Sequence, residues 1–370
     1  MHLAFVDFVY NYDAARPDTD APLGGTTSAI CFLGRELVKE NIQCTFFNRM
    51  VAPCEAYGIT SLPLQSLGDE IASDKYDAYI FCGRWSAELV GLVRTHTKKP
   101  LIAWMHESAF APPLTPALDD FDGVIYVSEW QKRVNAASAK LKWKQAVIRN
   151  AMNPAVADSF APDEEILAAK AKPPVLLFAG SFARGAFHIA PLLDKIRLRR
   201  SDFSVEMYCN LDPSRDPEKD AAYVAWLRGL PHIAHIGMVG QRELARKMKR
   251  ATVLLMPNPW PETSCITLIE GLASGLEAVI TARAALPETA AGFARQIPIT
   301  DADGQMRFDM PLDYTAFAAQ VIEAMDVRTR DPAATEARLR QQIAYFHANY
   351  QWSQRVAPWL AFVSGLAGSQ

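Results

Sequence analysis

The sequence lacks the residue patterns that mark several common classes of protein. Its six cysteines include no C-x-x-C pair, so neither a disulfide framework nor a zinc site is indicated. The motifs G-x-G-x-x-G, the P-loop, G-x-S-x-G and H-E-x-x-H are also missing. The sequence therefore lacks the dinucleotide-binding motif expected of a nicotinamide-dependent dehydrogenase.

Strong net charge and long apolar runs are missing as well. The formal net charge of −3 argues against a dedicated nucleic-acid binder, which needs a basic surface. No apolar run approaches the length of a membrane span, and the first residues enter a strand without a basic segment or a cleavage site. We therefore expect a soluble cytoplasmic protein with reduced thiols.

What is present is a regular alternation of apolar strands and helices, which is typical of parallel α/β sheets. The first series of predicted strands covers Leu3–Val9, Gln43–Phe47, Ala78–Cys82, Leu101–Met105, Val124–Val127 and Ala146–Ile148. The second series covers Val175–Ala179, Phe203–Cys209, Ile233–Ile236, Thr252–Met256 and Ala278–Thr281. The length of 370 residues favours two domains. We predict two doubly wound domains, 1–155 and 156–351, joined near 153–172 and facing a cleft, where ligands bind preferentially.

The most informative segment runs from Thr252 to Thr281. An apolar strand enters a loop that contains three prolines, and N-cap residue types, Thr263 and Ser264, precede a helical pattern that Gly275 ends. The next buried strand follows. Such strand–loop–helix–strand units place ligands at the carboxyl end of the strand.

Two glutamates flank the predicted start of this helix. If the helix begins near Ser264, Glu262 and Glu270 lie up to ~12 Å apart. This is wider than the roughly 5–9.5 Å of a hydrolytic carboxylate pair and suits the two ends of a nucleotide sugar. The helix amino terminus between them favours phosphate. A solvated surface glutamate beside a packed helix fits the spacing equally well.

The pattern Pro-Glu262-(x7)-Glu270-(x4)-Gly275 resembles the Glu-x7-Glu motif of the retaining GT-B glycosyltransferases, the "glycosyl transferases group 1" family. The resemblance implies that Glu270 holds the nucleotide ribose and that Glu262 lies near the donor sugar. It places Thr263, Ser264 and Cys265 where the family often has Gly-Phe-Gly, and Leu276-Glu277 where it has Gly-Pro. These departures leave the donor sugar undefined.

Two further elements of the first domain match the family pattern. Gly24 and Gly25 precede a helix predicted over Thr26–Asn41, and paired glycines let backbone amides approach a ligand closely. His106 follows a buried strand, where the family often has a histidine that contacts the donor sugar. Turn chemistry at the glycines and a structural role for the histidine are the alternatives.

In the second domain, the segment from Gly180 to Gly185 resembles a shortened form of the family's Gly-Arg-x-Lys-Gly diphosphate loop. The resemblance makes Arg184 the cation on the donor phosphates and puts Ser181 at the position of the first basic residue. The loop around Val239 matches the one that abuts the nucleobase.

The remaining patterns carry less information. The C-terminal Asn349–Leu360 resembles the family's Tyr/Phe-Ser-Trp element, whose final helix, here about 352–370, crosses back to the first domain. Asp301 and Asp303 imitate an Asp-x-Asp metal motif but fit a polar turn. The basic stretch Lys132–Arg149, with Trp130 and Trp143, fits either a solvated helix face or contact with an anionic membrane, which would be peripheral and at the inner face.

The resemblance implies transfer of a sugar from a UDP- or GDP-linked donor to a hydroxyl acceptor, with retention of anomeric configuration. The acceptor is a glycan, a lipid-linked glycan or a small molecule, and polysaccharide biosynthesis is the expected setting. Neither a metal nor a separate cofactor is implied. The alternatives are a GT-B epimerase that acts on a nucleotide sugar and a non-catalytic nucleotide-sugar binding protein, which the shortened phosphate loop favours.

Overall fold

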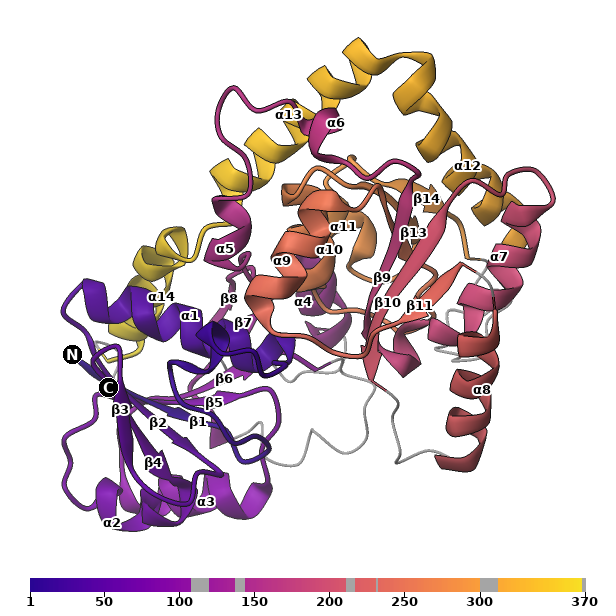
Figure 1. Ribbon diagram of the computed structural model, residues 1–370. Helices are drawn as coiled ribbons and strands as arrows, with labels where there is room; N and C mark the ends of the chain where they lie inside the picture. The colour runs from indigo at the N-terminus through magenta and orange to yellow at the C-terminus, as the bar shows by residue number, and fades with distance from the viewer. Residues whose placement is uncertain (108–119, 137–143, 211–216, 231, 300–311, 368–370) are drawn as a thin grey trace. The chain divides into compact units, whose positions relative to one another are not determined.

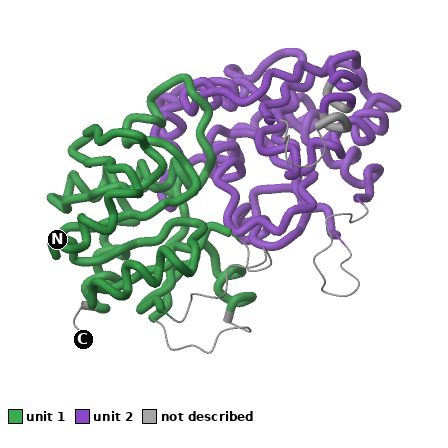
Figure 2. The backbone as a smooth tube through the Cα atoms, turned by 90° about the horizontal axis from the view of Figure 1, so that it is seen from below, with its two compact units in different colours: residues 1–151, 350–370 green, residues 152–349 purple. Residues whose placement is uncertain are grey.

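The computed structural model describes residues 1–107, 120–136, 144–210, 217–230, 232–299 and 312–367. The chain forms two compact units: unit 1 comprises residues 1–151 and 350–370, and unit 2 comprises residues 152–349 (Figure 2). Each unit is built on a parallel sheet with helices packed on it (Figure 1). Among the described residues, no helix combines the length and the apolar character needed to cross a membrane.

The sheet of unit 1 has the strand order β3-β4-β2-β1-β5-β6-β7-β8, and all neighbours are parallel except the antiparallel pair β3–β4. The strands are β1 (His2–Val6), β2 (Gln43–Asn48), β3 (Cys54–Ala56), β4 (Ile59–Pro63), β5 (Ala78–Cys82), β6 (Leu101–Met105), β7 (Gly123–Tyr126) and β8 (Lys144–Val147). The central strands β5, β6 and β7 are buried throughout, as expected when helices cover both faces of a parallel sheet.

Helices pack on both faces of this sheet. Figure 1 shows α1 and α14 on one side and α2 and α3 on the other. The α-helices of unit 1 are α1 (Gly25–Lys39), α2 (Leu67–Ile71), α3 (Ala87–His96), α4 (Glu129–Ala136) and α14 (Ser353–Ala367). The C-terminal helix is held by aromatic packing, because the ring of Trp359 lies 5.0 Å from that of Trp104 in β6.

Unit 2 has a six-stranded parallel sheet in the order β11-β10-β9-β12-β13-β14. Its strands are β9 (Val175–Ser181), β10 (Ser204–Asn210), β11 (Ile233–His235), β12 (Val253–Met256), β13 (Glu277–Thr281) and β14 (Arg295–Ile297). Its α-helices are α5 (Pro154–Ala157), α6 (Ile166–Ala169), α7 (Ile189–Arg197), α8 (Pro217–Gly229), α9 (Gln241–Arg250), α10 (Ile266–Ala273), α11 (Leu286–Ala290), α12 (Tyr314–Arg330) and α13 (Pro332–Asn349).

Successive residues of β12 face opposite sides of the sheet, so the strand connects two cores. Val253 and Leu255 belong to the cluster that α7 and α12 complete, whereas Leu254 packs under Gly271 of α10. The sequence prediction of two doubly wound parallel α/β units is confirmed.

The structure differs from the sequence prediction at several element boundaries. Strand β1 ends at Val6 rather than Val9, because the Asp7 carboxylate accepts hydrogen bonds from the backbone of Val9 (2.8 Å) and Tyr10 (3.4 Å) and turns the chain. The short strands β3, β4 and β14 were not predicted. The segment expected to join the domains is packed into unit 2, where the buried Lys170 ammonium donates to the carbonyl oxygens of Lys249 and Ser274.

Glu277, the residue in place of the family's proline, has a structural role. It begins β13 with its side chain 3% exposed and forms an ion pair with Arg338 of α13, while the Arg295 Nε lies 3.9 Å from its Oε2. A buried carboxylate needs such partners because removing it from water is costly. The ion pair therefore ties α13 to the sheet.

We predict that Arg338→Ala lowers the free energy of unfolding by about 2 kcal/mol or more. Removal of one partner leaves a buried charge poorly compensated, and the loss stays below that of a fully buried pair because Arg338 is 37% exposed. Urea unfolding measures it. The matched control is Arg330→Ala, which breaks the solvent-exposed pair with Glu323 and should lower the free energy of unfolding far less. Equal losses in the two variants would contradict the role assigned to Glu277.

Candidate functional site

In unit 2, the loops that follow β9 and β12 lie against each other. The two strands are parallel neighbours, so their loops leave the same edge of the sheet. Gly185 has φ +107°, and a Cβ atom at this position would lie 2.3 Å from the Pro257 carbonyl oxygen. Only glycine permits this approach. Gly185 thus brings the predicted phosphate loop onto the loop that carries Glu262.

The contact between these loops is centred on Arg184 and Glu262. The Arg184 Nη1 atom lies 2.5 Å from Glu262 Oε1, and its guanidinium carbon lies 5.0 Å from the centre of the Trp260 ring. Glu262 Oε1 also accepts a hydrogen bond of 2.9 Å from Asn258 Nδ2. No N–H bond of Nη1 points at an acceptor well enough to count as a hydrogen bond. The short contact with Glu262 is therefore an ion pair that rests on the attraction of opposite charges. The two residues predicted to serve phosphate and sugar therefore touch.

The helix between the two glutamates begins later than predicted. α10 starts at Ile266, and its N-cap is Cys265, which has φ +69° and no side-chain cap hydrogen bond. Thr263 and Ser264 are buried and do not cap it. The left-handed backbone of Cys265 prevents an earlier start. The amino end of α10 carries the positive end of the helix dipole, which interacts favourably with an anion.

Glu270 lies inside α10 with its side chain buried. Its Oε1 accepts a hydrogen bond of 3.1 Å from the backbone N–H of Asn153. Burial raises the pKa of the Glu270 carboxyl from 4.5 to about 7, against the opposing effect of that hydrogen bond. Near neutral pH the group is therefore poised between its neutral and charged forms.

Asn153 connects Glu270 to the loop that contains Val239. The Asn153 side chain caps α5 by accepting from Ala155 N, and its Nδ2 donates to Gln241 Oε1 at 3.2 Å. Gln241 begins α9, two residues after the half-buried Val239. Ser181, at the other candidate phosphate position, is the last residue of β9 and pairs with Asn210 of β10.

In unit 1, Gly24, Gly25 and His106 belong to elements that meet near Gly83, which follows β5. Gly24 is the N-cap of α1, and Gly25 begins that helix. A Cβ atom built on Gly83 would lie 3.3 Å from Thr26 Cγ2 and 4.0 Å from the Cβ of His106. The start of α1 and the end of β6 therefore lie close together.

Neither backbone conformation nor internal packing requires glycine at position 24. Its φ is −76°, and a Cβ atom there would meet no atom within 4 Å. The backbone of Gly24 thus faces open space. A glycine in this situation is explained by a ligand that approaches the backbone from outside, or by the residue's ordinary tolerance as an N-cap.

His106 lies directly after β6, and its ring centre is 4.5 Å from that of Trp104. Burial lowers the pKa of His106 from 6.5 to about 3. The imidazole is therefore neutral at physiological pH. A neutral imidazole can exchange hydrogen bonds with a hydroxyl group but supplies no positive charge.

The sequence analysis did not identify two asparagines that contact the candidate glutamates, and two of its candidate aspartates lie outside the described residues. Asn258 and Asn153 both contact a candidate glutamate, and their only sequence signal was an asparagine before a proline, which is common in turns. Asp301 and Asp303 fall in 300–311, which is not described.

The comparisons with known proteins bear on the fold. No protein-family model matches the sequence, and a search of curated proteins gave no match. Sucrose-phosphate synthase from Thermosynechococcus elongatus is similar over 100% of both chains, with 15% identity and a TM-score of 0.74. A glycosyltransferase from Rickettsia africae matches over 99% of this chain and 98% of its own, with 13% identity and a TM-score of 0.72.

HepE from Anabaena, in complex with UDP-glucose, is similar over 100% of both chains, with 12% identity and a TM-score of 0.68. At identities this low, the likeness shows the fold alone. The two parallel-sheet α/β units are those of the GT-B fold, as the sequence resemblance implied.

The burial of Glu270 generates a stability prediction. We expect Glu270→Gln to raise the free energy of unfolding at pH 8, because a carboxyl whose folded pKa is raised is destabilising once pH exceeds its unfolded value. A pKa of about 7 against 4.5 sets an upper limit of roughly 3 kcal/mol. The gain should shrink as pH falls from 7 and disappear below pH 4.5. Urea unfolding from pH 4 to pH 8 tests it, and a gain independent of pH would contradict the assigned burial.

Proposed function

We propose that this protein transfers a glycosyl group from a nucleotide-diphospho sugar, UDP- or GDP-linked, to a hydroxyl acceptor with retention of anomeric configuration. The observation that carries the proposal is the contact of Arg184 with Glu262 beside the amino end of α10. It assembles a cation, a carboxylate and a helix amino terminus at the carboxyl edge of a parallel sheet, where such folds bind ligands. The neighbours with this fold include a glycosyltransferase and a protein in complex with UDP-glucose, which supports the same function.

In this proposal the donor diphosphate lies at the amino end of α10. Arg184 offsets part of its negative charge, and the backbone amides near Thr263–Cys265 donate to its oxygens. Charge on the leaving diphosphate grows in the transition state, so donors already fixed in place lower the barrier most. Ser181 at the end of β9 contributes a hydroxyl rather than the charge of the family's basic residue.

The two glutamates divide the remainder of the donor between them. Glu270 accepts hydrogen bonds from the ribose hydroxyls, and it titrates to its charged form as the nucleotide supplies new donors. Glu262 holds both Arg184 and a hydroxyl of the donor sugar. The loop at Val239 borders the nucleobase, because the Asn153–Gln241 hydrogen bond links it to the Glu270 end of the site.

The proposal assigns substrate contacts to three residues of unit 1. The neutral His106 imidazole makes a hydrogen bond with a sugar hydroxyl, and the exposed backbone of Gly24 and Gly25 admits a hydroxyl-bearing substrate. The acceptor hydroxyl attacks from the face that the diphosphate leaves, which retains the configuration. The proton of the hydroxyl passes to the leaving phosphate oxygen.

The Arg184–Glu262 ion pair also favours a second candidate, a non-catalytic nucleotide-sugar binding protein. The cation expected on the diphosphate already has a carboxylate partner. A binding protein would retain nucleotide affinity and release no free nucleotide. Titration calorimetry combined with a nucleotide-release assay on a panel of UDP- and GDP-linked sugars separates the two functions.

We predict different effects of the two glutamates on nucleotide binding. Glu270→Ala should weaken binding of the nucleoside diphosphate at least ~10-fold, because ribose hydroxyls lose a charged acceptor. Glu262→Ala should slow transfer while nucleoside diphosphate binding is kept or tightened, since Arg184 is released from its partner. Calorimetry and initial rates measure the two effects.

The control for this experiment is Arg330→Ala, which removes an exposed guanidinium elsewhere in unit 2 and should change neither quantity. Equal losses of nucleotide affinity in both glutamate variants would overturn the division of roles.

Arg184→Ala should slow transfer by ~10²–10³-fold.

A second prediction separates ligand approach from fold requirements at Gly24. Gly24→Ala should change the free energy of unfolding by less than ~1 kcal/mol, because the added Cβ meets no protein atom and alanine is only a poorer N-cap. Transfer should fall by up to ~10²-fold if donor or acceptor must approach this backbone. Unfolding and rate measurements on the same variant test it, and an unchanged rate would remove Gly24 from the proposed site.

A further inference from the structure

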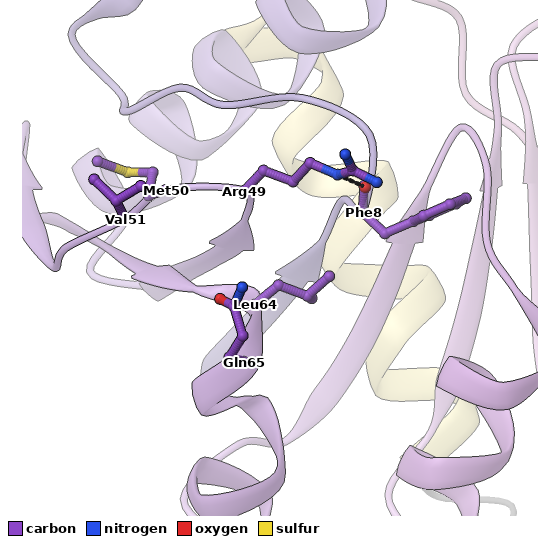
Figure 3. A pocket seen from close by; sticks show the side chains of 6 residues that line it. All are labelled: Phe8, Arg49, Met50, Val51, Leu64 and Gln65. Carbon is purple, nitrogen blue, oxygen red and sulfur yellow. Dashed lines mark hydrogen bonds between the residues drawn. The ribbon is translucent and has the colours of Figure 1, made fainter.

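Unit 1 carries a pocket that none of the residues discussed above lines. Its volume is about 750 Å³, within the range of small-molecule sites. The six residues that line it come from the segments directly after three neighbouring parallel strands (Figure 3). They are Phe8, Arg49, Met50, Val51, Leu64 and Gln65.

The position of this pocket in the sheet points to a ligand site. Phe8 follows β1, Arg49 follows β2 and Leu64 follows β4. The pocket therefore lies at the carboxyl edge of the sheet, the same edge at which His106 follows β6. Ligands of open parallel sheets bind along this edge.

The lining is mostly apolar and partly exposed. Phe8, Met50, Val51 and Leu64 present apolar side chains, and Val51 is 95% exposed. One exposed valine needs no explanation, but an apolar cluster around a concave surface is typical of a binding site. The apolar part of a ligand can therefore be buried here.

Arg49 supplies positive charge at a defined position. Its backbone N–H donates to the Tyr10 carbonyl oxygen at 3.0 Å, and its Nε donates to that of Phe8 at 2.5 Å (Figure 3). Among the described residues it forms no ion pair, so its two terminal amino groups remain for a ligand. The carboxylate that interacts electrostatically with Arg49 is Asp7, which is buried and already accepts two backbone hydrogen bonds. Burial raises the pKa of Asp7, and the nearby Arg49 acts in the opposite direction.

The strand order fixes how far this pocket lies from the reacting end of unit 1. From β2 to β6 the sheet runs β2-β1-β5-β6, which is three strand spacings. At about 4.8 Å per spacing, Arg49 and His106 lie on the order of 14 Å apart along the edge. A monosaccharide is too short to reach from one to the other.

We propose that the pocket binds the non-reacting end of an elongated acceptor, and that this end joins an apolar group to an anionic group held by Arg49. The acceptor role rests on the proposed glycosyl transfer, whereas the chemistry of the ligand rests on the pocket alone. Gln65 adds an amide at the rim that can bond to a polar group of the same ligand.

The test uses octyl phosphate below its micelle concentration as the probe, with binding followed by calorimetry on the full chain. Octyl phosphate should bind saturably and at least ~10-fold more tightly than either octyl glucoside or inorganic phosphate, because each of these lacks one half of the recognised chemistry. Arg49→Ala should weaken the binding by ~10-fold or more. Arg330→Ala is the matched control and should leave it unchanged.

A charge-sign pair at Val51 sharpens the test, because a residue that is 95% exposed can be changed without unfolding the protein. Val51→Asp should repel the anion and weaken binding, whereas Val51→Lys should keep or strengthen it. Equal effects of Asp and Lys would overturn the anion assignment. Inorganic phosphate binding as tightly as octyl phosphate would overturn the apolar assignment. Binding only to vesicles of anionic phospholipid would make the surface a membrane contact and contradict an acceptor pocket.

The outcomes also distinguish this inference from the proposed function. Failure of octyl phosphate to bind, in a protein that binds nucleotide sugars, overturns the inference and leaves the function standing. Failure of every nucleotide sugar to bind overturns the function and the acceptor role, even if octyl phosphate binds as expected.

Discussion

Parallel pairing of β9 with β12 is the constraint on which the arrangement of the candidate site in unit 2 depends. Neighbouring parallel strands end at the same edge, so the loops after them must either pack or collide. Gly185 allows the two loops to pack, because without a Cβ atom it can lie against the Pro257 carbonyl oxygen. The Arg184–Glu262 ion pair forms where the two loops approach.

The same edge rule organises unit 1, with a different result. The loops after β5 and β6 and the start of α1 meet at Gly83, while the loops after β1, β2 and β4 surround the apolar pocket. One sheet edge thus carries two chemically distinct surfaces. Near Gly83 this edge brings Thr26 and the neutral His106 together, whereas around Arg49 it forms an apolar pocket with one guanidinium.

The buried charged groups of unit 2 differ in how fully the fold supplies their partners. Glu277 has arginine partners and Lys170 donates to two carbonyl oxygens, so both are satisfied by the fold itself. Glu270 has one backbone donor and a pKa raised to about 7. Glu270 therefore destabilises the fold when it is charged, which Glu277 and Lys170 avoid through their partners.

The sequence by itself determined the alternation of strands and helices, and with it two doubly wound units, because burial on both faces of a parallel sheet requires continuous apolar runs. It also marked Glu262, Glu270 and Arg184 one by one. Only the tertiary structure decided that Arg184 meets Glu262, that Asn153 bonds to Glu270 and that residues from three strand ends enclose a pocket around Arg49. These contacts join residues far apart in the chain, and strand order and loop packing set them, which local patterns do not encode.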